Sequence, residues 1–380
     1  MSEFDDIRPY DDSEVPAVMA RLIADPEFID LLLSRRMPRL AKICPWLLRP
    51  FVRRGLAKAM ASVSTVDDLQ SHLTTSLKGL LDTTTDGCTV SGLDKLDPNK
   101  AYLFLSNHRD IAMDPAMVNI ALLDKGMDAV RIAIGDNLLS KPFAADLMRV
   151  NRSFIVKRSV SGRREKLEAL KTLSAYIRHS LSNDKVSIWI AQREGRAKDG
   201  HDRTETALLK MLALSRSKDQ NFAEAIAELC IVPVAISYEY DPCDIDKGRE
   251  LYAKQQGESY IKQQYEDLDT IQKGFVGYKG RIHVAFGDPL GSQYESADAL
   301  AAEVDKQIYR DYKLFPSNII AYQMCGHSDG LQQLKSQWPD CDWDGVEAFF
   351  NARLAAAPRA YREIIIQGYA APVINYLHVN

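Results

Sequence analysis

The sequence lacks the features that mark membrane-spanning, secreted or disulfide-stabilised proteins. Its 380 residues include only six cysteines, none in a C-x-x-C pair, so we expect reduced thiols. The longest stretch without a charged side chain, 364–380, contains Pro372 and Asn375 and falls short of the roughly 20 apolar residues of a spanning helix. The acidic, polar residues 1–14 predict no secretory signal peptide. We therefore expect a cytoplasmic protein.

A strong net charge is also missing. The formal net charge is −4, with 26% charged and 46% hydrophobic residues, which is ordinary globular composition and argues against a protein that binds nucleic acid over its whole surface. Acidic and basic residues nevertheless occupy separate segments near the N-terminus. Residues 1–30 are rich in acids, whereas no acid occurs from Leu31 to Val66, a stretch with eight arginines and lysines.

Residues 34–60 combine these bases with apolar residues at helical spacing, and three prolines divide the segment into short helices. Such a basic amphipathic segment can lie on an anionic membrane surface, with its bases on lipid phosphates. Alternatively, its apolar stripe packs on the rest of the protein. The pattern does not separate these two interpretations.

From residue 100 onward, short apolar runs alternate with helical stretches, which is typical of an α/β domain with a covered, mostly parallel sheet. We expect an N-terminal helical region at 1–94, the α/β domain at 95–290, with a polar insertion or hairpin at 241–280, and a C-terminal helical region at 291–380. The expected strands are 101–105, 129–134, 153–156, 186–191, 230–237 and 281–286. In such sheets, functional residues gather in loops at the C-terminal strand ends.

The loop after the first expected strand holds a histidine and two aspartates. His108 leaves the end of the strand, Asp110 follows in the loop, and Asp114 stands where a helix begins, before Pro115. A carboxylate bonded to one imidazole nitrogen fixes the tautomer and leaves the other nitrogen as a base. Either aspartate can play this part, and capping of the helix is a further interpretation of Asp114.

Basic residues dominate two later loops at the same end of the expected sheet. Lys157 and Arg158 follow the strand 153–156, and Arg196 follows 186–191 after Gly195, which allows a tight backbone path. Arginine binds phosphate through two parallel hydrogen bonds. A histidine base near loop arginines therefore indicates activation of a neutral nucleophile on a phosphate-bearing substrate.

Over residues 100–290, the order of these elements resembles the glycerol-3-phosphate/lysophospholipid (1-acylglycerol-3-phosphate) acyltransferase superfamily. The family has a His…Asp motif, a Phe-Ile-x-Arg-Arg motif, a Glu-Gly-x-Arg motif and a Val-Pro strand. The matching segments here are Asn107-His108…Asp114, Phe154–Arg158, Glu194-Gly195-Arg196 and Val232-Pro233-Val234.

Two departures from the family pattern stand out. Asp114 lies six residues after His108, where the family has five, and one residue is missing between Gly195 and Arg196. A one-residue bulge in the first loop, or use of Asp110, would restore the pair. The family places its aspartate at the start of the following helix, which favours Asp114.

The resemblance implies an O-acyltransferase of bacterial-type lipid synthesis. It would move a fatty acyl group from acyl-CoA or acyl carrier protein to a hydroxyl of glycerol-3-phosphate or a lysophospholipid, with His108 as general base and Asp114 or Asp110 as its partner. No metal or redox cofactor is implied. The protein would meet the inner face of the cytoplasmic membrane peripherally. The residues implied to bind substrate are Asn107, Arg109, Lys157, Arg158, Glu194, Gly195 and Arg196.

Two other functions stay open. The same fold could acylate a lyso-aminolipid or another alcohol, because arginine pairs equally well with a carboxylate. The displaced aspartate and the shortened third motif leave room for an inactive lipid- or carrier-protein-binding protein. A thioesterase or lipase is disfavoured because the sequence has no G-x-S-x-G nucleophile motif. His201 and Asp202 have no further ligands at metal-binding spacing, which predicts no metal site.

Overall fold

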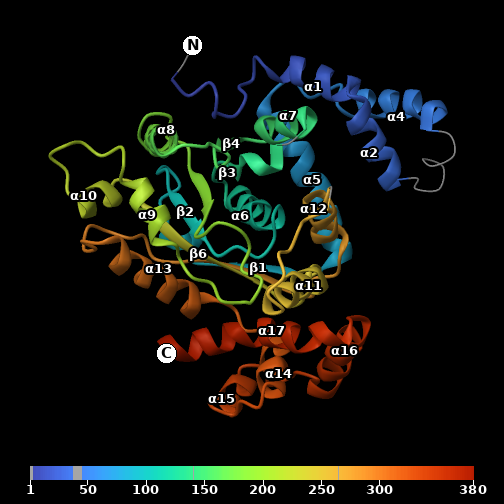
Figure 1. Ribbon diagram of the computed structural model, residues 1–380, viewed down its shortest axis with the longest axis vertical. Coiled ribbons are helices and arrows are strands. Elements are labelled where there is room, and N and C mark those ends of the chain that lie inside the picture. Colours follow the sequence, from blue (N-terminus) through green and yellow to red (C-terminus); the bar gives the residue numbers. More distant parts are fainter. Residues whose placement is uncertain (1–2, 37–44, 140, 264) are drawn as a thin grey trace. The chain divides into compact units, whose positions relative to one another are not determined.

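The computed structural model describes residues 3–36, 45–139, 141–263 and 265–380 (Figure 1). The chain forms two compact units. The first comprises Met1–Lys78 and Val130–Tyr176, and the second comprises Gly79–Ala129 and Ile177–Asn380. Each unit is therefore assembled from two separate stretches of sequence, and the expected boundaries at residues 94 and 290 stay predictions.

The second unit is built around five strands in the order β1-β7-β6-β2-β5. The central strand β2 pairs in parallel with β5 and β6, β1 pairs in parallel with β7, and only the β6–β7 pair is antiparallel. The bounds are β1 (Cys88–Ser91), β2 (Leu103–Ser106), β5 (Ile188–Ala191), β6 (Ile231–Tyr238) and β7 (Ile282–Phe286).

Helices cover these strands because the strands are apolar on both faces. Every residue of β2 and β6 is buried. Helix α6 (Met113–Asp124) contacts β7, and α13 (Ala297–Asp311) contacts both β6 and α9 (Thr206–Leu212) (Figure 1). Helix α10 (Phe222–Ala227) precedes β6. The expected α/β fold with a mostly parallel, covered sheet is confirmed.

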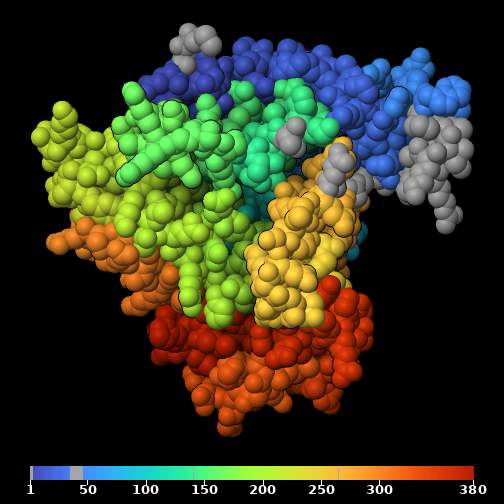
Figure 2. Space-filling view, in the orientation of Figure 1, coloured from blue at the N-terminus to red at the C-terminus, as the bar shows by residue number. Residues whose placement is uncertain are grey.

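The remaining parts of the second unit are helical. The segment 241–280 forms α11 (Asp244–Gln255) and α12 (Glu266–Val276), not a hairpin; Figure 2 shows them as a yellow surface region. The C-terminal helices are α14 (Pro316–Met324), α15 (Leu331–Ser336), α16 (Trp343–Ala356) and α17 (Arg359–Val379), and α17 continues through Pro372. Within the residues that the structure describes, no helix has the length and hydropathy needed to cross a bilayer.

The first unit contains a parallel strand pair, β3 (Arg131–Gly135) and β4 (Ser153–Val156), and several helices. Arg21 and Tyr10 both bond Asp146 of α7 at 2.8 Å, which ties the N-terminal segment to that helix. The helices are α1 (Val15–Ala24), α2 (Pro26–Arg36), α4 (Pro45–Ala59), α7 (Pro142–Val150) and the first parts of α5 (Val66–Thr84) and α8 (Arg163–Ser182).

One strand was not expected from the sequence. Strand β1 lies inside the region 1–94, which the sequence predicts to be helical, and it extends the sheet beside β7. Its four residues, Cys-Thr-Val-Ser, are all exposed. Because a short exposed strand carries neither a continuous apolar run nor a clear alternation, its sequence gives no strand signal.

Gly92, which follows β1, provides a test of this edge of the sheet. Its φ of +81° suits glycine, and a Cβ there would lie 1.9 Å from the Phe286 carbonyl oxygen. We expect Gly92→Ala to lower the free energy of unfolding by at least about 1–3 kcal/mol in urea titrations, from the backbone strain alone. Gly126→Ala is the matched control, because its φ is +77° but a Cβ meets nothing within 4 Å. Equal losses in the two variants would contradict the close approach of Gly92 to β7.

Candidate active site

His108 and Asp114 meet in the loop between β2 and α6. The Nδ1 atom of His108 lies 2.9 Å from Oδ2 of Asp114. The Asp114 side chain is fully buried, whereas the His108 side chain keeps 14% of its surface exposed. The imidazole ring packs edge-on against Trp189, with ring centroids 5.8 Å apart. The contact with Asp114 uses Nδ1 and leaves Nε2 as the ring nitrogen available for proton transfer.

Three further donors fix the Asp114 carboxylate. Its Oδ2 atom accepts hydrogen bonds from the backbone N–H groups of Arg109 and Asp110, at 2.7 and 2.9 Å. Its Oδ1 atom accepts from the Tyr238 hydroxyl at 2.8 Å. Burial, together with the Asp114 charge, raises the pKa of Tyr238, so this phenol stays a donor at neutral pH. The carboxylate that faces His108 is thereby held by the loop and by the end of β6.

Asp110, the alternative partner, faces elsewhere. Its Oδ1 atom accepts from the N–H groups of Ala112 and Met113, at 3.0 and 2.9 Å, and so closes the turn that leads into α6. Burial raises the pKa of Asp110, and its carboxylate packs against the backbone of Gly274 in α12. The extra residue of the first motif is thus absorbed in this turn, and Asp114 reaches His108 despite the longer spacing.

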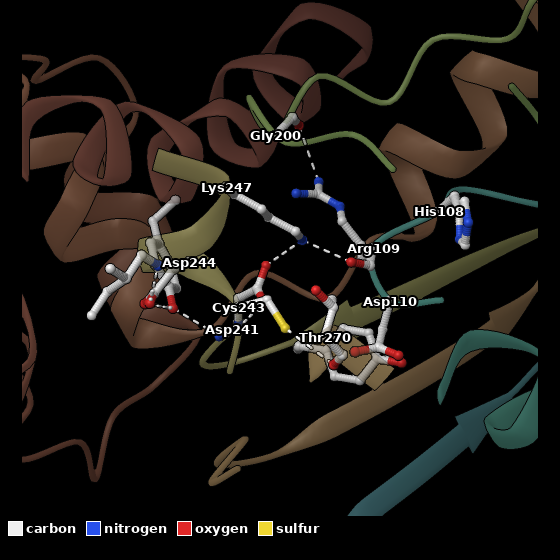
Figure 3. A network of polar contacts seen from close by, with 12 residues as sticks. His108, Arg109, Asp110, Gly200, Asp241, Cys243, Asp244, Lys247 and Thr270 are labelled. Atoms are coloured by element: carbon white, nitrogen blue, oxygen red, sulfur yellow. Dashed lines mark hydrogen bonds and ion pairs between the residues drawn. The ribbon is translucent and has the colours of Figure 1, made fainter. Parts of the chain in front are cut away.

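Asn107 and Arg109 flank His108 but turn away from the solvent. Asn107 is fully buried, and its side chain accepts from the N–H of Ile236 at 2.8 Å and donates to the Ile236 carbonyl at 3.0 Å. The Arg109 guanidinium donates to Asp202 at 2.6 Å and to the Gly200 carbonyl at 3.0 Å. Figure 3 shows this side chain beside Gly200, with the His108 ring apart from the network. The geometry gives both residues contacts within the protein.

The loop after β5 brings Arg196 close to the histidine. The N–H of Ala197 donates to the His108 carbonyl at 2.8 Å, and Gly195 takes a φ of +74° in the exposed turn that also contains Glu194. The Nη1 atom of Arg196 is buried and has no hydrogen-bond partner among the described residues. The positive charge of Arg196 also acts to lower the pKa of Asp110, although burial outweighs it. A cationic donor without a partner thus lies near the histidine loop.

Lys157 and Arg158 belong to the other compact unit, where they follow β4. The Lys157 ammonium is 3.4 Å from the Asp6 carboxylate. The Arg158 guanidinium lies against the backbone of Gly135. The predicted role of both residues in binding substrate stays a prediction.

Some residues around the histidine have no motif that identifies them. Tyr238 ends a strand, and Lys247 lies in the insertion; both reach the loop only through the tertiary fold. The sequence pairs Asp202 with His201, yet Asp202 contacts Asn107 and Arg109, while His201 approaches Asn375. In the described parts of the chain, no group of three or more potential ligands could hold a metal ion.

The two aspartates can be separated by matched substitutions. We expect Asp114→Asn to lower the turnover of the acyl transfer implied by the sequence by about 10²–10⁴-fold, because the group that orients the base is lost. Asp110→Asn should change turnover by less than about threefold, because asparagine accepts the same two backbone N–H groups. Steady-state rates of the two variants test this assignment, and circular dichroism checks that both variants are folded. A larger loss for Asp110→Asn would reverse the assignment.

Part of the chain is similar in sequence to a known protein family. Residues 87–237 match the sequence model of the family described as Acyltransferase. No curated protein matches the chain. Among solved structures, the 1-acyl-sn-glycerophosphate (LPA) acyltransferase PlsC from Thermotoga maritima superposes with a TM-score of 0.37 at 14% identity, over 83% of this chain and 99% of that chain. The family match covers β1 to β5 and nearly all of β6, together with the histidine loop, so this part of the chain is similar in sequence to the Acyltransferase family.

Proposed function

We propose that the protein transfers a fatty acyl group from an acyl thioester, acyl-CoA or acyl carrier protein, to a hydroxyl of glycerol-3-phosphate or a lysophospholipid in lipid biosynthesis. The observation that carries this proposal is the His108–Asp114 pair, in which a partly exposed imidazole is bonded through Nδ1 to a fully buried carboxylate. That arrangement suits removal of a proton from a neutral hydroxyl.

The chemical steps follow from the free Nε2 atom. Nε2 of His108 takes the proton of the acceptor hydroxyl while the oxygen attacks the thioester carbonyl carbon. The tetrahedral intermediate then expels the thiolate, which regains a proton from the imidazolium as the ester forms. Asp114 stabilises the imidazolium and keeps the ring oriented. The acyl group passes directly from sulfur to oxygen, and no acyl-enzyme is needed.

Arg196 supports a phosphate on the acceptor. The residue is partly exposed, and its Nη1 atom lacks a partner among the described residues; a guanidinium with an unused donor is a favourable contact for a phosphate oxygen. Glu194 and Gly195 shape the same loop. A carboxylate on a lyso-aminolipid would satisfy Arg196 equally well, and this is the second acceptor class to test.

The experiment is thiol release by the purified chain from acyl-CoA and acyl carrier protein, with glycerol-3-phosphate, lysophosphatidate or a lyso-aminolipid as acceptor. We expect acceptor-dependent release that falls by about 10²–10⁴-fold in His108→Ala and persists in His283→Ala, a histidine that bonds Thr89 in the sheet. Acceptor-independent release would instead indicate a thioesterase. No release with any pair would favour a lipid- or carrier-binding protein.

Arg196→Ala tests the acceptor phosphate separately. We expect it to raise the KM for a phosphorylated acceptor about 10-fold or more, because a charge-assisted hydrogen bond is lost, while the KM for the acyl donor changes less. Arg216→Ala, which removes a side chain bonded to the Ala213 carbonyl, should change neither constant. An equal effect of Arg196→Ala on both substrates would contradict its assignment to the acceptor.

We also propose that α4 binds an anionic membrane surface. Three apolar side chains of this helix are largely exposed: Trp46 at 69%, Phe51 at 66% and Leu47 at 51%. Of the expected basic residues, Arg49 pairs with Asp30 at 2.7 Å and Arg53 bonds the Ala24 carbonyl, whereas Arg54 and Lys58 are exposed. Apolar and basic groups on one surface helix match the acyl boundary and the phosphates of an anionic leaflet. Residues 37–44 of the expected basic segment lie outside the described residues.

Liposome co-sedimentation tests this contact. We expect Trp46→Ser with Phe51→Ser to weaken binding to phosphatidylglycerol vesicles by about 10-fold or more, through lost apolar burial. Arg54→Ser with Lys58→Ser should weaken it at low salt and less at high salt. Phe349→Ser, which removes an aromatic side chain 45% exposed on α16, is the control and should leave binding unchanged. Unaltered binding in both double variants would overturn the proposal.

A further inference from the structure

The two neighbours of His108 meet at one buried carboxylate. Asn107 Nδ2 and Arg109 Nη2 both donate to Oδ2 of Asp202, at 3.3 and 2.6 Å. The side chains of residues 107 and 109 thus converge on Asp202, whereas the His108 ring between them bonds Asp114. The Asp202 carboxylate therefore binds the side chains of the residues immediately before and after the histidine.

Within the described ranges of the chain, the Asp202 side chain makes no other hydrogen bond. It is 2% exposed, and its Oδ1 atom is buried without a partner among the described residues. Burial raises the pKa of Asp202, against the lowering effect of the Arg109 charge, whereas the pKa of Arg109 stays above its ordinary value because nearby groups, Asp202 first, outweigh its burial. The 2.6 Å contact between Arg109 Nη2 and Asp202 Oδ2 is that of an ion pair. Both hydrogen bonds that this carboxylate makes in the described part of the chain go to residues of the histidine loop.

The segment that carries Asp202 is itself anchored on both sides. On one side, Gly200 lies directly against the Gly368 carbonyl of α17, where its φ of +79° and the lack of a Cβ allow close approach. On the other, the N–H and hydroxyl of Thr204 donate to Asp305 of α13 at 2.8 and 2.6 Å. Asp202 is thus held in place by helices α17 and α13.

Arg109 is also restrained through its backbone. The Lys247 ammonium, 4% exposed, donates to the Arg109 carbonyl at 2.7 Å and pairs with Asp241 (Figure 3). The N–H of Arg109 is bonded to Asp114. The carbonyl, the N–H and the Nη2 atom of this one residue therefore all have partners, whereas its Nε atom is buried without one among the described residues. These contacts leave the loop next to His108 little freedom to move.

We propose that Asp202 is a positioning residue for His108 and that Asn107 and Arg109 act as its links to the loop instead of binding substrate. This inference rests on the proposed function, because it takes His108 as the base. A base must stay within hydrogen-bonding reach of the acceptor hydroxyl, and a displacement of about 1 Å can cost on the order of 10²-fold in rate. Asp202 therefore affects the chemical step and not the binding of either substrate.

The first test is Asp202→Asn, which keeps the shape of the side chain and removes its charge. We expect kcat to fall about 10- to 100-fold while both KM values stay within about threefold. The matched control is Asp244→Asn, because Asp244 is also a buried carboxylate in an ion pair, with Arg353 at 2.5 Å. That variant should lose thermal stability to a similar degree and keep its kcat.

A second variant separates positioning from folding. Replacing Arg109 by Met and Asp202 by Leu together removes both charges of a buried pair, a change that costs far less stability than removing one partner. We expect a melting temperature near that of the unsubstituted chain and a kcat as low as that of Asp202→Asn. If Asp202→Asn does not fold, this double variant decides the question.

The outcomes distinguish this inference from the proposed function. Full turnover in His108→Ala would overturn the proposed function itself. Loss of turnover in His108→Ala, with normal kcat in the Asp202 variants, would overturn only the positioning role. A raised KM with an unchanged kcat in the Asp202 variants would instead support the role of Asn107 and Arg109 in binding substrate that the sequence implies. If Asp244→Asn lost kcat to the same degree, the effect of Asp202 on kcat would be one of general structural support and not of positioning His108.

Discussion

The candidate site depends on one buried carboxylate that gathers donors from separate parts of the fold. Asp114 receives the imidazole, two loop N–H groups and the Tyr238 hydroxyl. Its place in the first turn of α6 also sets it near the positive end of the helix dipole. The loop backbone, α6 and β6 must therefore all be in place before the histidine has its partner. The geometry of the base is a property of the assembled second unit.

Around this carboxylate, the protein buries several ion pairs, and these are better understood as determinants of position than as sources of stability. Two of them, Arg109–Asp202 and Lys247–Asp241, meet at Arg109, whose carbonyl accepts from Lys247 (Figure 3). Burying paired charges gains little free energy of folding relative to apolar side chains of equal volume. Such pairs nevertheless demand particular geometry, because a misplaced partner leaves a buried charge unpaired.

The parts of this arrangement that the sequence predicts are those encoded locally. Apolar runs located β2, β5 and β6, and the histidine loop follows from its place at the end of a strand. The choice between Asp110 and Asp114 stayed open because spacing alone does not show which backbone N–H groups each carboxylate accepts. The contacts of Tyr238, Lys247 and Asp202 with the loop are not predictable for a related reason: each residue reaches the loop across more than ninety positions of sequence, from a segment without a motif. Strand β1 was missed because its exposed residues resemble a loop.

The pairing of β1 with β7 has a consequence for the order in which the chain folds. Thr89 bonds His283, 194 positions later, and the apolar strand β2 lies in the sequence between them. During synthesis, both edges of β2 are paired only after first β5 and then β6 have been made. Strand β1 can pair only after β7 has been made. Until then, the nascent chain exposes unpaired apolar strands, the form most prone to aggregate and most in need of a chaperone.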